Sequence, residues 1–182
     1  NKKTNLWVEL GLQTADAQSA AFIRRGYPLS VFTQAVYALT ERNIPVVVHI
    51  ILGLPGESSE TVLRTIDYLN RLPIQGVKLQ LLHVLSDSDL ADLYRAGEYT
   101  PLEKEEYLTL VGDCIAHLRA DIVLHRLTGD GDKNTLLAPL WSLRKRDVLN
   151  HLHRYLRENH IRQGMSCKID LSVIYNKPKD VL

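Results

Sequence analysis

The chain has 182 residues, of which 45% are hydrophobic and 24% are charged, and its net charge is +1. This composition is typical of one compact domain or a piece of a larger one, and it argues against disorder and against a protein built mainly to bind a phosphate backbone. No apolar run approaches the roughly 20 residues of a membrane helix, and the polar first residues lack the apolar core of a signal peptide, so no membrane partner is expected.

Strands and helices are predicted to alternate along the chain. Short apolar runs rich in β-branched residues predict buried strands over residues 6–14, 45–52, 76–85 and 121–127. Apolar periodicity and capping residues predict helices over residues 16–24, 28–42, 59–72, 88–96, from 101 to about 118, and 143–159, with a last short strand or extended tail over 169–175. This alternation predicts parallel βαβ units with right-handed crossovers, and therefore an α/β fold.

Four strands are too few to close a barrel. The strand predicted over residues 6–14 would leave a long apolar edge uncovered unless another segment or chain pairs with it. We therefore expect an N-terminal half of the sheet to be missing from this chain. If nothing covers this edge, self-association through the first strand is expected.

Polar residues interrupt the first predicted strand. Glu9, Gly11 and Gln13 alternate along it, so they are expected to lie on the same face. Polar side chains in an apolar strand need partners. The three positions are therefore either a satisfied polar network or part of a ligand site.

A turn rich in glycine follows the most apolar strand. Gly53 and Gly56 allow the backbone to approach a ligand closely, and Pro55 stiffens the turn. Glu57 lies beside the start of the next predicted helix, where a carboxylate is favoured. The alternative is a rigid turn with a capping acid. The sequence is not a Walker A loop, because it lacks the Gly-Lys-Ser/Thr ending.

The third predicted strand carries three further polar residues. Lys78 and Gln80 share one face, and His83 is expected on the other face unless a bulge intervenes. A lysine inside an apolar strand is rarely buried without a partner, so a ligand or an ion pair is expected for Lys78. His83 is either an ordinary core histidine or a site residue.

A dense polar cluster follows the fourth predicted strand. His125, Arg126, Asp130 and Asp132 surround its C-terminal end. In parallel α/β sheets ligands bind at this end of the strands, so the cluster is a possible substrate or anion site. A loop held by its own exposed salt bridges is the alternative.

Motifs for a metal site or another known reaction centre are absent from the sequence. It contains no Cys-x-x-Cys or His-Glu-x-x-His, and His49, His83 and His125 need not converge, so no metal site is expected within the chain. Gly-x-Ser-x-Gly and Gly-x-Gly-x-x-Gly are also absent. Cys114 and Cys167 are far apart and in no motif, which predicts free thiols in a cytoplasmic protein.

An ordered set of short segments resembles a known family. The segments are residues 8–14 (VELGLQT), 23–27 (IRRGY), 49–58 (HIILGLPGES), 76–85 (GVKLQLLHVL), 125–131 (HRLTGDG), 138–142 (APLWS) and 163–164 (QG). Together they resemble radical S-adenosylmethionine (SAM) proteins of the bacterial YhcC type, which are related to the elongator branch. Each segment is weak alone, but the ordered set is highly specific.

The resemblance implies a fold. Residues 1–130 would form the C-terminal half of an open (β/α)6 radical SAM barrel, a partial TIM-type barrel, and residues 131–182 a C-terminal helical extension and tail. The part of the barrel spanned would be strands four to six and the strand that follows.

The resemblance also implies a cofactor site. The positions that match SAM-binding segments of the family are Glu9, Gln13, Arg25, Gly53, Pro55, Gly56, Glu57, Lys78, Gln80 and His83. In this scheme Glu9 and Gln13 meet the ribose or the methionine part, and Arg25 pairs with the methionine carboxylate. The turn over residues 53–57 packs near the adenine.

The chain departs from the family in three respects. It has no Cys-x3-Cys-x2-Cys loop to hold the [4Fe-4S] cluster, and Gln80 and Tyr27 stand where histidines are expected. The full-length protein is expected to cleave SAM reductively to a 5′-deoxyadenosyl radical, whereas this chain alone is expected to be inactive. The catalytic residues and the substrate are not evident from the sequence.

Two other functions are compatible with these residues. The chain could be a cluster-free module that binds SAM or a nucleotide. It could also be a fragment of an RNA-modifying enzyme, with RNA contacted by the basic helix that runs from Arg144 to Arg157. A charged run of this kind is more often a solvated helix face.

Overall fold

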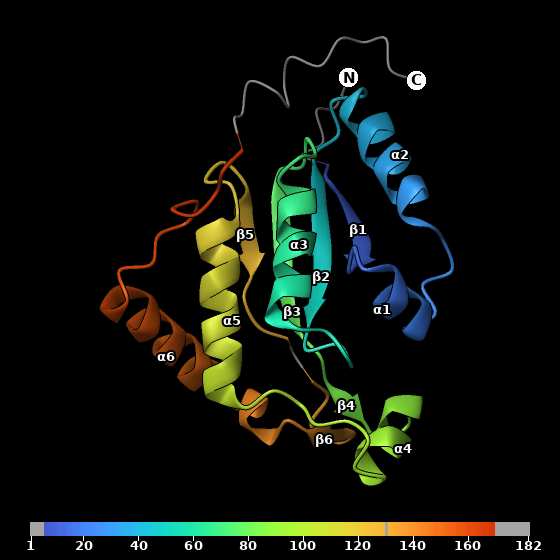
Figure 1. Cartoon of the computed structure of the whole chain (residues 1–182), viewed down its shortest axis with the longest axis vertical. Helices are drawn as coiled ribbons and strands as arrows, with labels where there is room; N and C mark the ends of the chain where they lie inside the picture. The colour runs from blue at the N-terminus through green and yellow to red at the C-terminus, as the bar shows by residue number, and fades with distance from the viewer. Residues whose placement is uncertain (1–5, 130, 170–182) are drawn as a thin grey trace.

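A parallel sheet of four strands forms the centre of the fold (Figure 1). The computed structural model describes residues 6–129 and 131–169. The strands, in the order β1-β2-β3-β5, are Val8–Gln13, Val46–Leu52, Gly76–Leu81 and Val123–Arg126. Each neighbouring pair runs parallel. The predicted α/β fold with parallel βαβ units is confirmed.

Helices lie around this sheet. They are α1 Ala17–Phe22, α2 Leu29–Thr40, α3 Ser59–Leu69, α4 Asp89–Arg95, α5 Lys104–His117 and α6 Lys145–Glu158, with a short 3-10 helix η1 over Leu140–Leu143. In Figure 1, α3 and α5 lie in front of the strands, and α6 packs on α5. The strands run downward in this view, and α1 and α4 lie near their C-terminal ends.

Alternation along β2 separates two faces of the sheet. Val46, Val48, Ile50 and Leu52 belong to the main core together with residues of α2, α3 and α5. Complete burial of each such side chain stabilises a fold by about 1.5–3 kcal/mol. His49 points the other way. The face that carries it, with Glu9 of β1 and Lys78 and Gln80 of β3, is called the open face below.

The third predicted strand is shorter than expected. β3 ends at Leu81, and the chain then forms a separate strand, β4 (Val84–Leu85), which pairs antiparallel with β6 (Leu136–Ala138). The neighbouring strand β5 ends at Arg126, opposite Lys78, so the end of β3 has a partner only in β2. The prediction of one strand over residues 76–85 was therefore wrong.

Two other elements differ from the prediction. The helix expected from Pro101 begins at Lys104, because Glu103 and Glu106 form a capping box that fixes the start. β6 and η1 were not predicted at all. They follow the glycine-rich loop, and β6 is defined by its pairing with β4 rather than by a periodic pattern. Most of the strand or tail predicted over 169–175 lies outside the described residues.

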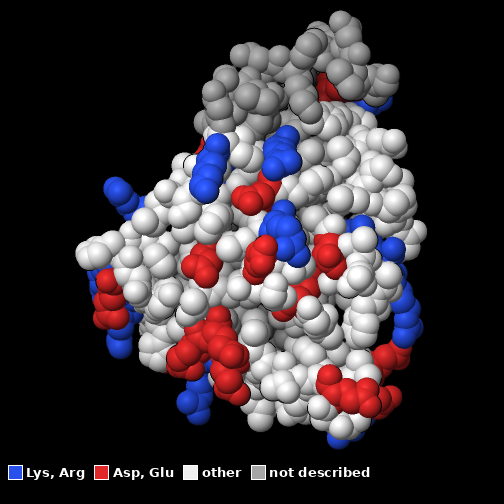
Figure 2. All heavy atoms as spheres, viewed as in Figure 1, with Lys and Arg blue, Asp and Glu red and all other residues white. Residues whose placement is uncertain are grey.

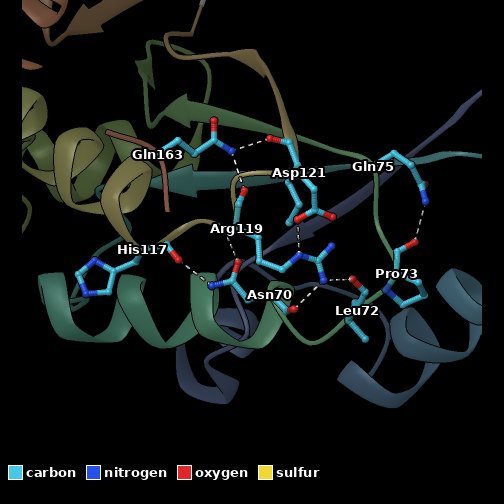
Figure 3. A network of polar contacts seen from close by, with 9 residues as sticks. Asn70, Leu72, Pro73, Gln75, His117, Arg119, Asp121 and Gln163 are labelled. Carbon is cyan, nitrogen blue, oxygen red and sulfur yellow. Dashed lines mark hydrogen bonds and ion pairs between the residues drawn. The ribbon is translucent and has the colours of Figure 1, made fainter. Parts of the chain in front are cut away.

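A buried arginine joins several segments at the N-terminal end of the sheet (Figure 3). Arg119, only 2% exposed, donates from Nη1 to the carbonyl oxygens of Asn70 at 2.8 Å and Leu72 at 3.3 Å. Its Nε binds Asp121 at 2.9 Å. The Asn70 amide donates to the His117 carbonyl at 2.8 Å and accepts from the Arg119 backbone N–H at 2.9 Å. The C-terminal ends of α3 and α5 are thereby tied together.

Replacement of Asn70 by alanine tests this connection. The change removes both side-chain bonds and leaves a buried carbonyl and a buried N–H without partners, so we expect it to lower the free energy of unfolding by about 2–3 kcal/mol. Urea unfolding of the wild type and the variant measures the loss. The exposed Asn150 in α6 is the control, since Asn150→Ala should change stability by less than about 0.5 kcal/mol. Equal effects of the two substitutions would contradict the proposed role of Asn70.

Candidate functional site

Glu9 is the centre of a polar cluster on the open face. Its Oε2 accepts from Lys78 Nζ and from His49 Nε2, both at 2.6 Å, and its Oε1 accepts from Trp7 Nε1 at 3.2 Å. Strand register explains the convergence, because His49 is the Cα partner of Lys78 across β2 and β3. Three adjacent strands thus each contribute a charged or polar side chain to one point.

The cluster continues from His49 to Gln80. Gln80 Nε2 lies 2.8 Å from His49 Nδ1. A carboxylate can only accept, so His49 Nε2 donates to Glu9, and assignment of the other ring nitrogen as acceptor gives the Gln80 amide N–H a partner. The chain of polar contacts Glu9–His49–Gln80 therefore has one consistent set of donors and acceptors, which leads toward the C-terminal ends of the strands.

The surroundings of Glu9 favour its ionised form. The hydrogen bond from Lys78 and those from Trp7 and His49 lower the pKa of Glu9 from 4.5 to about 2. The side chain is 36% exposed, so solvent screens part of this interaction. At neutral pH the open face therefore carries a carboxylate whose nearest cation is Lys78.

Gln13 reaches the open face through an irregular strand end. The β1–β2 register shifts between Gly11 and Gln13, and Gln13 has a positive φ of 65°. A Cβ atom at Gly11 would lie 2.7 Å from Gln13 Nε2. Glycine at position 11 thus allows the Gln13 amide to fold over the strand, beside the Glu9 cluster.

Arg25 holds the end of β1 in place. Its Nη1 donates to the carbonyl oxygens of Leu12 at 3.0 Å and Thr14 at 2.6 Å, and its Nε donates to that of Tyr27 at 3.2 Å. The Tyr27 hydroxyl in turn donates to the Gly11 carbonyl. These contacts make Arg25 a backbone clamp. Pairing of Arg25 with a ligand carboxylate stays a prediction.

The turn after β2 is fixed at both ends. Gly53 and Gly56 have φ values of 90° and 77°, which L side chains rarely adopt. The Tyr99 hydroxyl donates to the Gly53 carbonyl at 2.8 Å, and burial raises the pKa of Tyr99 to about 12. Glu57 accepts from the Thr14 hydroxyl at 2.6 Å, and burial raises the pKa of Glu57. The turn is therefore bound to the end of β1.

His83 lies beyond the end of β3, and alternation along that strand does not define its direction. Its ring packs against the loop after β5, where a Cβ atom at Gly129 would lie 2.7 Å from His83 Cε1. The side chain lines a cavity that also includes Leu54 and Pro55. His83 and part of the turn thus meet at the C-terminal ends of the strands.

The structure describes His125 and Arg126, two of the residues predicted as a site around the end of β5. His125 lies over Gly76, where a Cβ atom would come within 2.5 Å of its ring, and its ring centroid is 6.5 Å from that of Trp7. Arg126 is the Cα partner of Lys78. Asp130 lies outside the described residues. His125 is therefore near Trp7, which bonds to Glu9.

The structure adds two residues to those predicted for the open face. His49 was considered in the sequence only as a metal ligand, although a polar residue in an otherwise apolar central strand is itself a signal for a site. Trp7 precedes β1 and carries no pattern that indicates its contact with Glu9. Glu9, Lys78 and Gln80 do come together, as their alternation predicts, whereas Gln13 lies over Gly11 because β1 is irregular at that point.

The cysteines do not fit an iron–sulfur cluster. Cluster ligands are thiolates, and three in one loop are needed, whereas the chain has only Cys114 and Cys167. Cys114 is buried in the core, and burial raises the pKa of its thiol. Within residues 6–129 and 131–169, no group of three or more His, Cys, Asp or Glu side chains could hold a metal ion. In the same ranges, no helix has both the length and the apolarity required to cross a membrane.

The charge of Glu9 should be visible in the pH dependence of stability. Because its folded pKa lies below its ordinary value of 4.5, its ionised form stabilises the fold. This contribution is present above about pH 5 and is lost as the pH falls toward 2. We expect Glu9→Gln to lower the free energy of unfolding by about 1 kcal/mol at pH 7, and the difference from wild type to shrink as the pH falls below the ordinary pKa of 4.5 and to become small near pH 2. Urea unfolding curves of both proteins between pH 2 and pH 7 measure this difference, and Glu41→Gln, at an exposed glutamate, is the control. A difference in stability that does not change with pH would contradict the assigned role of Glu9.

Comparisons with family models agree with the resemblance found in the sequence. The model of the Radical SAM superfamily matches residues 2–69, and that of the Radical_SAM C-terminal domain matches residues 74–158. The chain is 34% identical over 164 residues to the uncharacterized protein YtqA of Bacillus subtilis, which covers 90% of this chain and 51% of YtqA. It is 33% identical over 156 residues to protein YhcC of Escherichia coli, which covers 86% of this chain and 50% of YhcC.

More distant proteins share the fold. The chain is 29% identical over 126 residues to a tRNA uridine(34) acetyltransferase of Dehalococcoides mccartyi, which covers 68% of this chain and 28% of that protein. The solved structure of Elp3 from the archaeon Methanocaldococcus infernus, with residues 1–46 deleted, has a similar fold, with a TM-score of 0.75 at 18% sequence identity. The match covers 87% of this chain and 37% of the Elp3 chain. The chain spans about half the length of the curated relatives YtqA and YhcC. On these grounds it belongs to the radical SAM superfamily, among proteins of the YhcC type.

Proposed function

We propose that this chain is part of a radical SAM enzyme and supplies one wall of its SAM site. The observation that carries the proposal is the convergence of Glu9, His49 and Gln80 on the open face, beside Gln13, in a chain of this family. When bound together, SAM and a [4Fe-4S] cluster supply reductive cleavage that yields a 5′-deoxyadenosyl radical. The described residues would bind and orient SAM.

The donors and acceptors of the open face suit a ligand such as SAM. The ionised Glu9 accepts hydrogen bonds and attracts a positive charge, and the amides of Gln13 and Gln80 can donate or accept. Hydroxyl, ammonium and carboxylate groups of SAM require this mixture. The backbone at Gly56 is also accessible, since no atom lies within 4 Å of a Cβ built there. These features support a polar ligand lying along the ends of β1, β2 and β3.

The cluster must be held elsewhere in the protein. Because this chain spans about half of its relatives and its two cysteines do not fit, we assign the cluster-binding loop to a part that the chain does not span. That part would also pair with β1, which in the described residues pairs only with β2.

A reducing, cytoplasmic compartment is proposed as well, because Cys114 and Cys167 are free.

SAM binding by the chain tests the proposed pocket. In titration calorimetry we expect SAM to bind at one site, and Gln13→Ala to weaken the affinity about tenfold, since about 1.4 kcal/mol of hydrogen bonding is lost. Gln34→Ala changes an exposed glutamine of α2 and should leave the affinity unchanged. No detectable binding of SAM, or equal affinities of the two variants, would refute the assignment of the pocket.

RNA is a second candidate ligand, favoured by the charge of the C-terminal region. Residues 144–168 contain seven Lys or Arg residues and two acidic ones, although the whole chain has a net charge of +1. Exposed positions of α6 and its flanks carry much of this charge, including Arg146, Arg154 and Arg157. A local basic surface of this kind suits a phosphate backbone. We propose that it contacts RNA in the complete enzyme.

Charge reversal in α6 tests this second proposal. The double variant Arg154→Glu/Arg157→Glu should weaken binding of a transfer RNA by at least about tenfold at low salt and should reduce the dependence of binding on salt. Arg71→Glu reverses an exposed charge outside α6 and serves as control. Filter binding over a range of salt concentrations measures both effects. If the α6 double variant and Arg71→Glu weaken binding of the transfer RNA to the same extent, α6 is not the RNA-binding surface.

A further inference from the structure

A cavity of about 560 Å³ lies between α1 and α4, at the C-terminal ends of β2 and β3. One wall comes from the end of α1 and a second from α4, while the turn after β2 and the segment after β3 complete it. Volumes of about 300–1,000 Å³ are typical of small-molecule sites. Ligands of parallel α/β sheets bind at this end of the strands. The cavity therefore has the size and the place of a substrate site.

The walls of the cavity are mainly apolar. Its large hydrophobic lining residues include Phe22, Leu54, Leu82, Leu85, Leu90 and Leu93. Phe22 is 50% exposed, whereas most phenylalanine side chains are buried, so its ring is available for contact with a ligand. Leu90 and Leu93 lie three residues apart on α4, so they share one face of the helix. These side chains offer a surface for an apolar group.

The second hydrophobic cluster keeps the α4 wall in position. Ala91 of α4 is buried together with Val84 of β4, Ala138 of β6 and Tyr99, which precedes α5. Pairing of β4 with β6 adds backbone hydrogen bonds to this support. α4 is therefore anchored by its own small core, which holds Leu90 and Leu93 at the wall of the cavity.

The rim of the cavity carries no net charge. Arg24 and Asp89, on opposite walls, form an ion pair, and their side chains are 78% and 76% exposed. Figure 2 shows basic and acidic side chains meeting at the lower right edge of the molecule, where α1 and α4 lie in the same view in Figure 1. Opposite charges this close cancel at a distance, so the rim does not select an ionic ligand.

The floor of the cavity depends on a glycine. The His83 ring packs against Gly129, where a Cβ atom would lie 2.7 Å from His83 Cε1 and 3.2 Å from the Leu81 carbonyl oxygen. Any side chain at position 129 would therefore displace the ring, which lines the cavity. Gly129 therefore helps to fix the position of one side chain of the cavity wall.

We propose that this cavity binds an uncharged apolar group of the substrate, aromatic or branched hydrocarbon, while SAM lies on the open face. The inference rests on the proposed function for its link to SAM, but the cavity itself does not. Apolar walls favour burial of such a group, and a charged group would lose its hydration without a net opposite charge at the rim. The substrate would then present a neighbouring atom toward the ends of the strands.

Two fluorescent probes that share an aromatic body test the class of ligand. N-phenyl-1-naphthylamine is uncharged, and 8-anilino-1-naphthalenesulfonate is its sulfonated relative. Titrated into the 182-residue chain, the uncharged probe should bind one saturable site at least as tightly as the sulfonated probe. Arg24→Gln should change its affinity less than about threefold, because an exposed pair contributes little. Tighter binding of the sulfonate by about tenfold or more, abolished in Arg24→Gln, would overturn the inference in favour of an anion site.

Variants of the wall locate the probe. Leu93→Trp fills the cavity and should weaken the uncharged probe at least about tenfold, whereas Leu143→Trp, at a leucine of η1 outside the cavity, should not. Gly129→Ala displaces His83 and should weaken the probe as well. Thermal unfolding of each variant shows that it is folded. Unchanged probe affinity in a folded Leu93→Trp variant would overturn the proposal.

SAM titrations separate this inference from the proposed function. If the chain binds the uncharged probe in the cavity but does not bind SAM, the proposed function fails and the apolar site stands. If SAM binds and Leu93→Trp leaves its affinity unchanged while the probe is lost, both stand. Competition of SAM with the probe for the same cavity would overturn the division into two sites.

Discussion

The register of β2 with its two neighbours is the constraint on which the site depends. His49 lies opposite Gly11 of β1 on one side and Lys78 of β3 on the other. A slip of one residue would turn His49 into the helix-covered core and expose Val48 or Ile50 instead. Burial of the four alternate aliphatic residues of β2 therefore stabilises the fold and also brings Glu9, His49 and Lys78 together.

The parts of the site predicted from sequence are those that depend on alternation. Glu9, Lys78 and Gln80 alternate with apolar residues along their own strands, so their common face follows from the two-residue period of a strand. The position of Gln13 does not follow in this way, because β1 is irregular after Gly11 and the side chain folds back. Local pattern cannot predict such a shift.

Elements defined by distant partners were missed for a different reason. β4 and β6 have two and three residues, too few for a periodic signal, and each exists as a strand because it pairs with the other. The ring of His83 is likewise directed by Gly129, which is far away in the chain. The arrangement of β4, β6 and α4 beside the cavity therefore could not be predicted from sequence patterns.

The buried arginine at the opposite end of the sheet has a consequence for the order of folding. The Gln163 amide donates to the carbonyl oxygens of Arg119 and Ile122, both at 2.7 Å (Figure 3). These two carbonyls lie side by side only when the turn before β5 is formed, and that turn is held by Arg119 bound to Asn70. We therefore expect the segment after α6 to dock last, once α3, α5 and β5 are assembled. A chain still emerging from the ribosome would keep this end open until Gln163 has left the exit tunnel.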